Sequence, residues 1–144
     1  MSGHEDRDRA FVYRVRVGYG DTDQGGVVHH SVYLRWLEQA RVELLRARGV
    51  VYRDLEYDEA LGLPVAEARI RYRKPARFDE ELAVETRVGR LSRASIRFDY
   101  VVRRGEEVLS EAEITLACVK LPEGRLQRLP DRLHAACTPD PASA

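Results

Sequence analysis

The chain has 144 residues and a formal net charge of zero, with 24 basic and 24 acidic side chains. Its length suits one domain whose core needs neither disulfide nor metal. The charge balance leaves no basic excess to recruit nucleic acid or an anionic membrane, and no apolar run is long enough for membrane insertion.

Two distant cysteines, Cys118 and Cys137, match no metal or redox spacing. We therefore expect a reduced, cytoplasmic setting, because stable disulfides belong to oxidising compartments. Residues 1–9 and 138–144 are expected to be flexible tails on a single domain that covers residues 10–137.

The first elements expected along the chain are a strand and a long helix. Apolar and polar residues alternate from Phe11 to Val17, which is typical of a half-buried strand. Residues 31–49 then place apolar side chains at three- and four-residue steps, which predicts an amphipathic helix of about five turns. Gly49 is well placed to end this helix in a left-handed conformation. Residues 52–62 could add a short second helix.

Four further strands are indicated after the helices, because alternation with a period of two returns. Pro75 is expected to end the first of them, since proline cannot donate to a β-ladder, and Gly105 centres a hairpin turn. We expect a mostly antiparallel sheet that follows the chain order, with the helix on one face, which is an α+β fold. The strands are expected over residues 66–73, 82–88, 96–102 and 108–121, and a short helix over 131–137.

Between the first strand and the long helix lies "GYGDTDQGGVVHH", residues 18–30. Aspartate and glycine are common turn residues, and an aspartate before a helix complements its positive end. The apolar "GGVV" nevertheless indicates a segment lying against the core. Free amides at a helix start could polarise a carbonyl, and a facing carboxylate could act as base or nucleophile. The adjacent His29 and His30 match no standard metal-ligand spacing.

Residues 19–41, "YGDTDQGGVVHHSVYLRWLEQAR", resemble the signature of the hotdog-fold acyl-CoA thioesterases. The resemblance is to the 4-hydroxybenzoyl-CoA thioesterase branch, which includes bacterial acyl-CoA thioesterases linked to the Tol-Pal system. That signature runs D-T-D-x-x-G, two hydrophobic residues, an aromatic residue and H-x-x-Y, and it continues into a helix with E-x-x-R. The resemblance extends from about Val12 to Leu129 and implies an antiparallel sheet wrapped around a long central helix. His29 departs from the pattern, because the family often has an aromatic residue there.

The resemblance also implies roles for the residues of the loop. Asp23 would be the catalytic carboxylate, which either attacks the thioester carbonyl or activates a water molecule. A backbone N–H near His30 would polarise that carbonyl, and the His30 side chain would orient a group or handle a proton. Gly26 and Tyr33 would contact the substrate, and Asp21 would shape the loop.

Glu38 has two possible roles on the predicted helix. An ion pair with Arg35 and Arg41 is expected, since each lies three positions away. Another hotdog branch uses a helix glutamate as its catalytic carboxylate, so Glu38 stays a second candidate for that role.

The remaining implications concern coenzyme A and the assembly. Its phosphates need cations, for which Arg93 is the first candidate, followed by Lys74 and Arg77. No metal or redox cofactor is implied, and a homodimer or homotetramer is expected, with the active sites at the dimer interface. The acyl group stays open, as do two alternatives: a hotdog hydratase or dehydratase, and a non-catalytic acyl-CoA-binding module.

Overall fold

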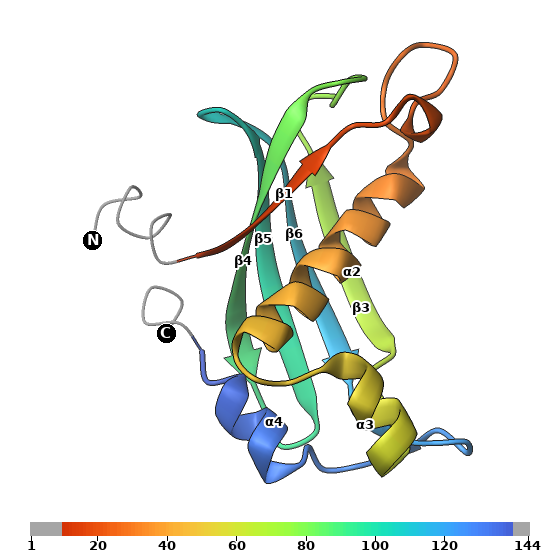
Figure 1. Cartoon of the computed structure of the whole chain (residues 1–144), viewed down its shortest axis with the longest axis vertical. Helices are drawn as coiled ribbons and strands as arrows, with labels where there is room; N and C mark the ends of the chain where they lie inside the picture. Colours follow the sequence, from red (N-terminus) through yellow and green to blue (C-terminus); the bar gives the residue numbers. More distant parts are fainter. Residues whose placement is uncertain (1–9, 140–144) are drawn as a thin grey trace.

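A computed structural model describes residues 10–139 (Figure 1). Residues 1–9 and 140–144, which include most of the two predicted tails, lie outside the described residues. The elements in chain order are β1 (Phe11–Arg16), the 3-10 helix η1 (Tyr19–Asp21), α2 (His30–Ala47), α3 (Tyr52–Glu59), β2 (Leu61–Gly62), β3 (Val65–Tyr72), β4 (Glu81–Leu91), β5 (Ser95–Arg104), β6 (Glu107–Ala117), β7 (Val119–Lys120), β8 (Arg125–Leu126) and α4 (Asp131–Ala136).

The five long strands form one antiparallel sheet in the order β1-β4-β5-β6-β3. The prediction that the sheet follows chain order is wrong for β3, which crosses over to pair with β6, so that Ile70 lies opposite Ala112. The edge of β4 that β3 would have used is taken by β1, where Tyr13 lies opposite Val84. Within this five-stranded sheet, only β4, β5 and β6 follow one another through hairpin connections, the second of them at Gly105, whose φ is 60°.

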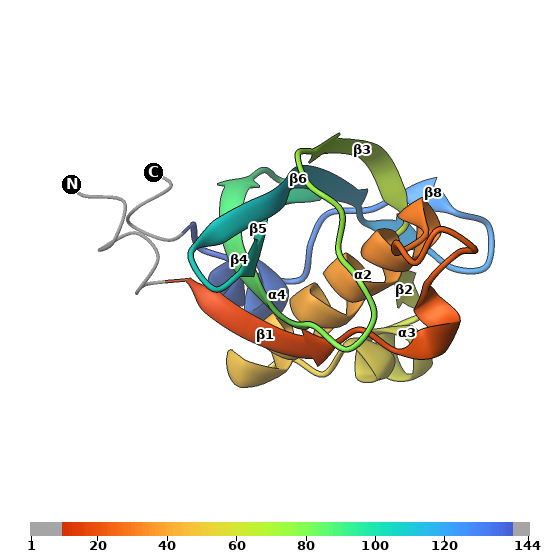
Figure 2. The same cartoon turned by 90° about the horizontal axis from the view of Figure 1, so that it is seen from above.

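The helix α2 lies across one face of the sheet, and the sheet curls around it (Figure 2). The helix buries Trp36, Leu37, Ala40 and Leu44 against inward side chains of the strands. On β5 these are the predicted residues Ile96, Phe98, Tyr100 and Val102, all buried. Gly49 has a φ of 86°, which confirms that it ends α2 in the left-handed region. The helix wrapped in a sheet is the arrangement expected of a hotdog fold.

Strand β3 departs from the half-buried pattern that its alternation predicts. It lies at an edge of the sheet, and only Ile70 along it is even partly buried. Val65 is 52% exposed and Tyr72 is 39% exposed. Helix α2 packs mainly on β1 and β4. Apart from Tyr72, whose ring contacts His30 and Tyr33 of α2, the inward side of β3 is therefore left largely uncovered within one chain.

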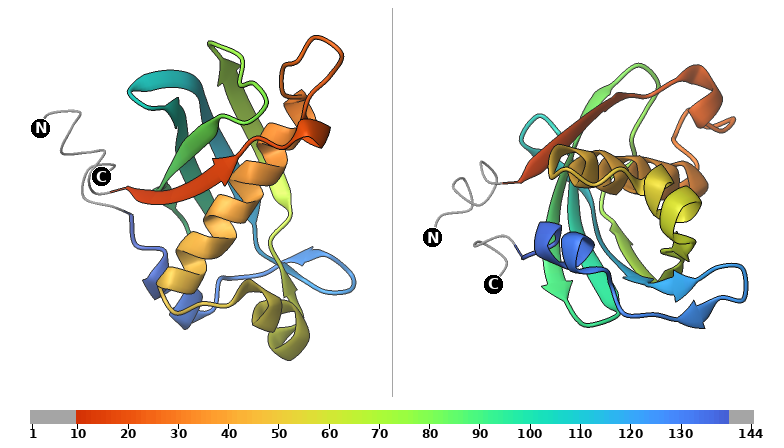
Figure 3. Two further views of the ribbon diagram at one scale, coloured as in Figure 1. Left: turned by 45° about the horizontal axis from the view of Figure 1, so that its top comes forward. Right: turned by 60° about the horizontal axis from the view of Figure 1, so that its bottom comes forward.

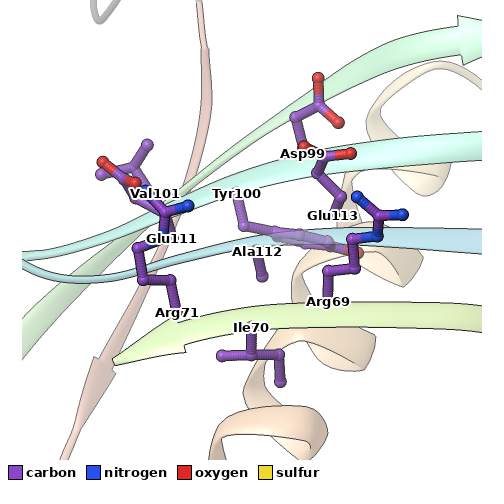
Figure 4. A pocket seen from close by; sticks show the side chains of 9 residues that line it. All are labelled: Arg69, Ile70, Arg71, Asp99, Tyr100, Val101, Glu111, Ala112 and Glu113. Carbon is purple, nitrogen blue, oxygen red and sulfur yellow. The ribbon is translucent and has the colours of Figure 1, made fainter. Parts of the chain in front are cut away.

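The sheet face turned away from α2 carries charged side chains around a shallow hollow over β3, β5 and β6 (Figure 4). Acidic and basic groups pair along this face: Arg97 Nε lies 2.9 Å from Asp99 Oδ1, and Arg73 Nη2 lies 3.1 Å from Glu111 Oε2. The hollow therefore has no strong excess of charge of either sign.

The C-terminal segment runs from beside α3 along one end of the sheet to α4 (Figure 3). The strand predicted over residues 108–121 is shorter than expected, because β6 ends at Ala117 and the chain then turns into β7, which pairs with β2 and β8. None of the helices within residues 10–139 is both long and apolar enough to cross a membrane.

Candidate active site

Residues 21–29 fold as a small hairpin at the N-terminal end of α2. Asp23 N donates to Val27 O at 2.9 Å, and Gly26 N donates to Asp23 O at 3.0 Å. Thr22 bridges Val28 in antiparallel fashion, and Val28 is buried, as the apolar "GGVV" predicted. This is a three-residue turn that ends in a left-handed residue, a common hairpin form.

The two glycines of the turn serve different needs. Gly26 has a φ of 80°, which side chains other than glycine rarely adopt. A Cβ added to Gly25 would lie only 3.2 Å from Asp23 Oδ1. The Gly-Gly step is thus explained by the turn and by the close approach of the Asp23 carboxylate, with no ligand needed to account for it.

The Asp23 carboxylate is held on one side and open on the other. Its Oδ1 accepts hydrogen bonds from Gly25 N at 2.8 Å and from Val27 N at 3.3 Å. Its Oδ2 accepts none from the part of the chain that the structure describes, and the side chain is exposed. The turn therefore fixes the carboxylate in space while leaving one oxygen available to a substrate or a water molecule.

An open groove of about 570 Å³ runs beside this carboxylate. Two exposed aromatic residues form part of it: Tyr19 and Phe78 pack edge to face, with ring centroids 5.5 Å apart. Neither residue was predicted to line the groove, because Phe78 reaches Tyr19 only through the path of the chain between β3 and β4. The groove is lined by Tyr19, Thr22, Asp23, Gln24, Gly26, His29 and Phe78.

The start of α2 borders the same groove. His29 lines the groove and immediately precedes the helix, with extended backbone angles and no side-chain capping bond. The first amides of a helix lack intrahelical acceptors and lie at the positive end of its dipole. The Asp23 carboxylate therefore lines the same groove as His29, the residue that directly precedes the first amides of α2.

Asp21 anchors the loop rather than facing the groove. Its Oδ2 accepts from Gly18 N at 2.9 Å, and its Oδ1 accepts from Arg35 Nη2 at 2.8 Å. These contacts fit the loop-shaping role expected for this residue.

The predicted ion pair of Glu38 with Arg35 and Arg41 is wrong. Arg35 turns to Asp21 instead, and Arg41 is buried with its Nη1 3.4 Å from the Tyr100 hydroxyl. Within residues 10–139, no basic side chain pairs with Glu38, which is exposed and does not line the groove beside Asp23. Burial raises the pKa of Tyr100 to about 12.

His30 and Tyr33 face β3 and the core. The His30 ring stacks on Tyr72, with centroids 4.3 Å apart and planes 14° apart. Tyr33 is buried, its hydroxyl accepts from Ala76 N at 3.2 Å, and burial raises its pKa. Neither side chain lines the groove beside Asp23.

The three cations predicted for coenzyme A lie in different places. Arg77 bridges Val27 through its backbone, beside the loop. Lys74 Nζ pairs with Glu107 Oε2 at 2.5 Å. Arg93 lies near α4 at the opposite end of β4, a strand of 11 residues that spans about 33 Å. One chain therefore does not bring Arg93 to Asp23.

Among the residues that the structure describes, no three His, Cys, Asp or Glu side chains gather as a metal ion would require.

This chain is similar to known proteins in sequence and in fold. The model of the thioesterase-like superfamily matches residues 17–137. The acyl-CoA thioesterase YbgC of Haemophilus influenzae is 37% identical over 129 residues, which are 90% of this chain and 95% of that protein. The crystal structure of a hypothetical protein, TT1821, from Thermus thermophilus has a TM-score of 0.82 at 39% identity, over 88% of this chain and 95% of that one.

A third relative carries a substrate in its name. The crystal structure of a 1,4-dihydroxy-2-naphthoyl-CoA thioesterase from Synechocystis has a TM-score of 0.82 at 25% identity. The match covers 89% of this chain and 95% of that one.

Proposed function

This chain belongs to the thioesterase-like superfamily, and we propose that it hydrolyses an acyl-CoA thioester to a free carboxylic acid and coenzyme A. The observation that carries the proposal is the Asp23 carboxylate, fixed through Oδ1 by two backbone amides and open at Oδ2 toward the groove. The same turn of chain leads into the start of α2.

Two routes use the open oxygen of Asp23. In the first route Oδ2 is a general base: it takes a proton from water while the water oxygen bonds to the thioester carbon. The C–S bond then breaks, and the proton passes from Asp23 to the leaving thiolate. As a nucleophile, Oδ2 bonds to that carbon itself, the thiolate leaves, and water then hydrolyses the resulting anhydride. Both routes give the same acid and thiol.

The developing oxyanion needs donors in either route. We assign this role to a backbone amide at the first turn of α2, near His30, because those amides lack intrahelical acceptors. The stack of the His30 ring on Tyr72 holds the imidazole against the edge strand β3. In this position the His30 side chain lies outside the groove beside Asp23, so it could meet a substrate only at the side of β3.

The proposed active site includes a second copy of the chain. The uncovered inward side and free edge of β3 support a homodimer formed along that edge, and pairs could join as a homotetramer. Leu34 on the adjacent flank of α2 is 46% exposed, which adds apolar area for such a contact. Because Arg93 cannot reach Asp23 within one chain, we propose that Arg93 of a second copy binds coenzyme A phosphates, with Arg77 in support. A cytoplasmic setting is supported by Cys118 and Cys137, which are free and buried.

The direct test is free-thiol release from a panel of short-chain, long-chain and aromatic acyl-CoAs. The proposal expects thiol release from at least one member, and the preferred member identifies the acyl class. Hydration of an enoyl-CoA without thiol release would support a hydratase. Acyl-CoA binding without turnover of any member would support a binding module, and either result would overturn the thioesterase proposal.

A further inference from the structure

The hairpin that carries Asp23 is built against residues 73–80, the segment that links β3 to β4. Val28 N donates to Ala76 O at 3.0 Å, and Val27 forms an antiparallel bridge with Arg77. Val27 N in turn donates to Asp23 Oδ1. The position of the Asp23 carboxylate therefore depends on the position of the linking segment.

Glu80 closes the last turn of that segment. Its Oε1 accepts from Arg77 N at 2.7 Å, and its backbone N donates to Arg77 O at 3.3 Å. Val17 N, at the end of β1, donates to Glu80 O at 2.9 Å. Glu80 thus joins the linking segment to the sheet and also holds Arg77, the residue that bridges to the Asp23 hairpin.

Both oxygens of the Glu80 carboxylate accept hydrogen bonds from Arg104, the last residue of β5. Arg104 Nη1 lies 2.9 Å from Glu80 Oε1 and 2.8 Å from Oε2, and it also donates to Pro75 O at 3.4 Å. The other side of the guanidinium is held by Glu107, which also pairs with Lys74. The Arg104 and Glu80 side chains are only 30% and 24% exposed, so water screens this pair less than an ordinary surface pair.

We propose that Arg104 is a positioning residue for Asp23, which acts through the Glu80 carboxylate and the backbone of Arg77 and Val27. This inference rests on the proposed role of Asp23 in thioester hydrolysis. Arg104 does not line the groove beside Asp23. Its effect passes through hydrogen bonds that fix where the hairpin sits, and errors of about 1 Å in such placement can cost roughly 100-fold in rate.

The neighbouring residue of β5 provides a matched control. Arg103 Nε lies 2.9 Å from Glu85 Oε1, and these side chains are 19% and 8% exposed, so this ion pair is more buried than that of Arg104. Glu85 belongs to β4, outside both the linking segment and the Asp23 hairpin. A loss of activity caused only by breaking a partly buried ion pair of β5 would therefore appear in Arg103→Met as well as in Arg104→Met.

The test compares wild type, Arg104→Met, Arg104→Lys and Arg103→Met on an acyl-CoA and on a small thioester that lacks the nucleotide. We expect Arg104→Met to lower kcat about tenfold on both substrates with KM within about twofold, Arg104→Lys to recover part of that loss, and Arg103→Met to keep the wild-type kcat. Equal kcat values for the two methionine variants would overturn the proposal.

Hydrogen exchange gives a second readout that needs no substrate. Backbone amides of residues 27 and 28 should exchange faster in Arg104→Met than in Arg103→Met, while amides in the middle of β5 exchange alike. Unchanged exchange at residues 27 and 28 would also overturn the positioning role. Wild type that hydrolyses no thioester would instead refute the proposed function, and the exchange comparison would still decide whether Arg104 holds the hairpin.

Discussion

Replacing Tyr33 by phenylalanine tests whether its hydroxyl supports the fold or contacts the substrate. The hydroxyl accepts a 3.2 Å bond from Ala76 N, and both residues are buried, at 3% and 0% exposure. Tyr33→Phe leaves that amide without a partner, and a buried donor left unsatisfied costs about 1–3 kcal/mol. For a domain of this size the expected fall in Tm is about 4 °C per kcal/mol.

The assay is urea unfolding of the variant and wild type at equal protein concentration, with KM for an acyl-CoA measured in parallel. Tyr13→Phe is the control, because its hydroxyl bonds Gln39 at 3.1 Å on the surface and should change stability by less than about 0.5 kcal/mol. Unchanged stability of Tyr33→Phe together with a raised KM would refute the structural assignment and return Tyr33 to the substrate contacts.

Two further predictions concern charge. Arg93→Ala should raise KM for acyl-CoA severalfold and leave hydrolysis of a small thioester without the nucleotide nearly unchanged; equal losses on both substrates would exclude phosphate binding at Arg93. Burial raises the pKa of Tyr100 from 10.0 to about 12, so its stabilising contribution is complete below pH 10 and is lost as the pH rises through 12. The loss amounts to at most about 2.7 kcal/mol, and chemical unfolding between pH 9 and 12 should show a shallower decline for Tyr100→Phe than for wild type.

The sequence predicts those elements whose burial is decided by neighbours close in the chain. Alternation along β5 correctly places Phe98 and Tyr100 inward, and the helical period of α2 places Trp36 in the core. Alternation along β3 does not show which element covers it, so Tyr72 was expected inside and is 39% exposed. The crossover of β3 to β6 depends on which edges other strands occupy, and no local pattern contains that information.

In the candidate site too, the parts formed by residues close in sequence were predicted, and the parts formed by distant residues were not. Asp23 stands within a long motif, and its hairpin forms from residues that are adjacent in sequence. Phe78 comes to the groove, and Glu80 comes to Arg104, only through the path of the segment that links β3 to β4. Glu80 is one of 24 acidic residues, and nothing in its local sequence marks its role. The predicted ion pair of Glu38 with Arg35 does not form, because Arg35 Nη2 donates to Asp21 Oδ1 at 2.8 Å. Asp21 lies fourteen positions away in the chain, beyond the reach of a helical spacing rule.

The most direct test of the proposed mechanism is the kcat of Asp23→Asn on the preferred acyl-CoA, measured beside Asp54→Asn, an aspartate of α3 whose Oδ1 lies 3.8 Å from Arg53 Nε. The asparagine at position 23 keeps an oxygen that can accept from Gly25 N and Val27 N, so the hairpin and the affinity for coenzyme A should be retained. We predict a fall in kcat of about 1,000-fold or more for Asp23→Asn and none for Asp54→Asn. A kcat for Asp23→Asn within about tenfold of wild type would contradict the central role of the Asp23 carboxylate.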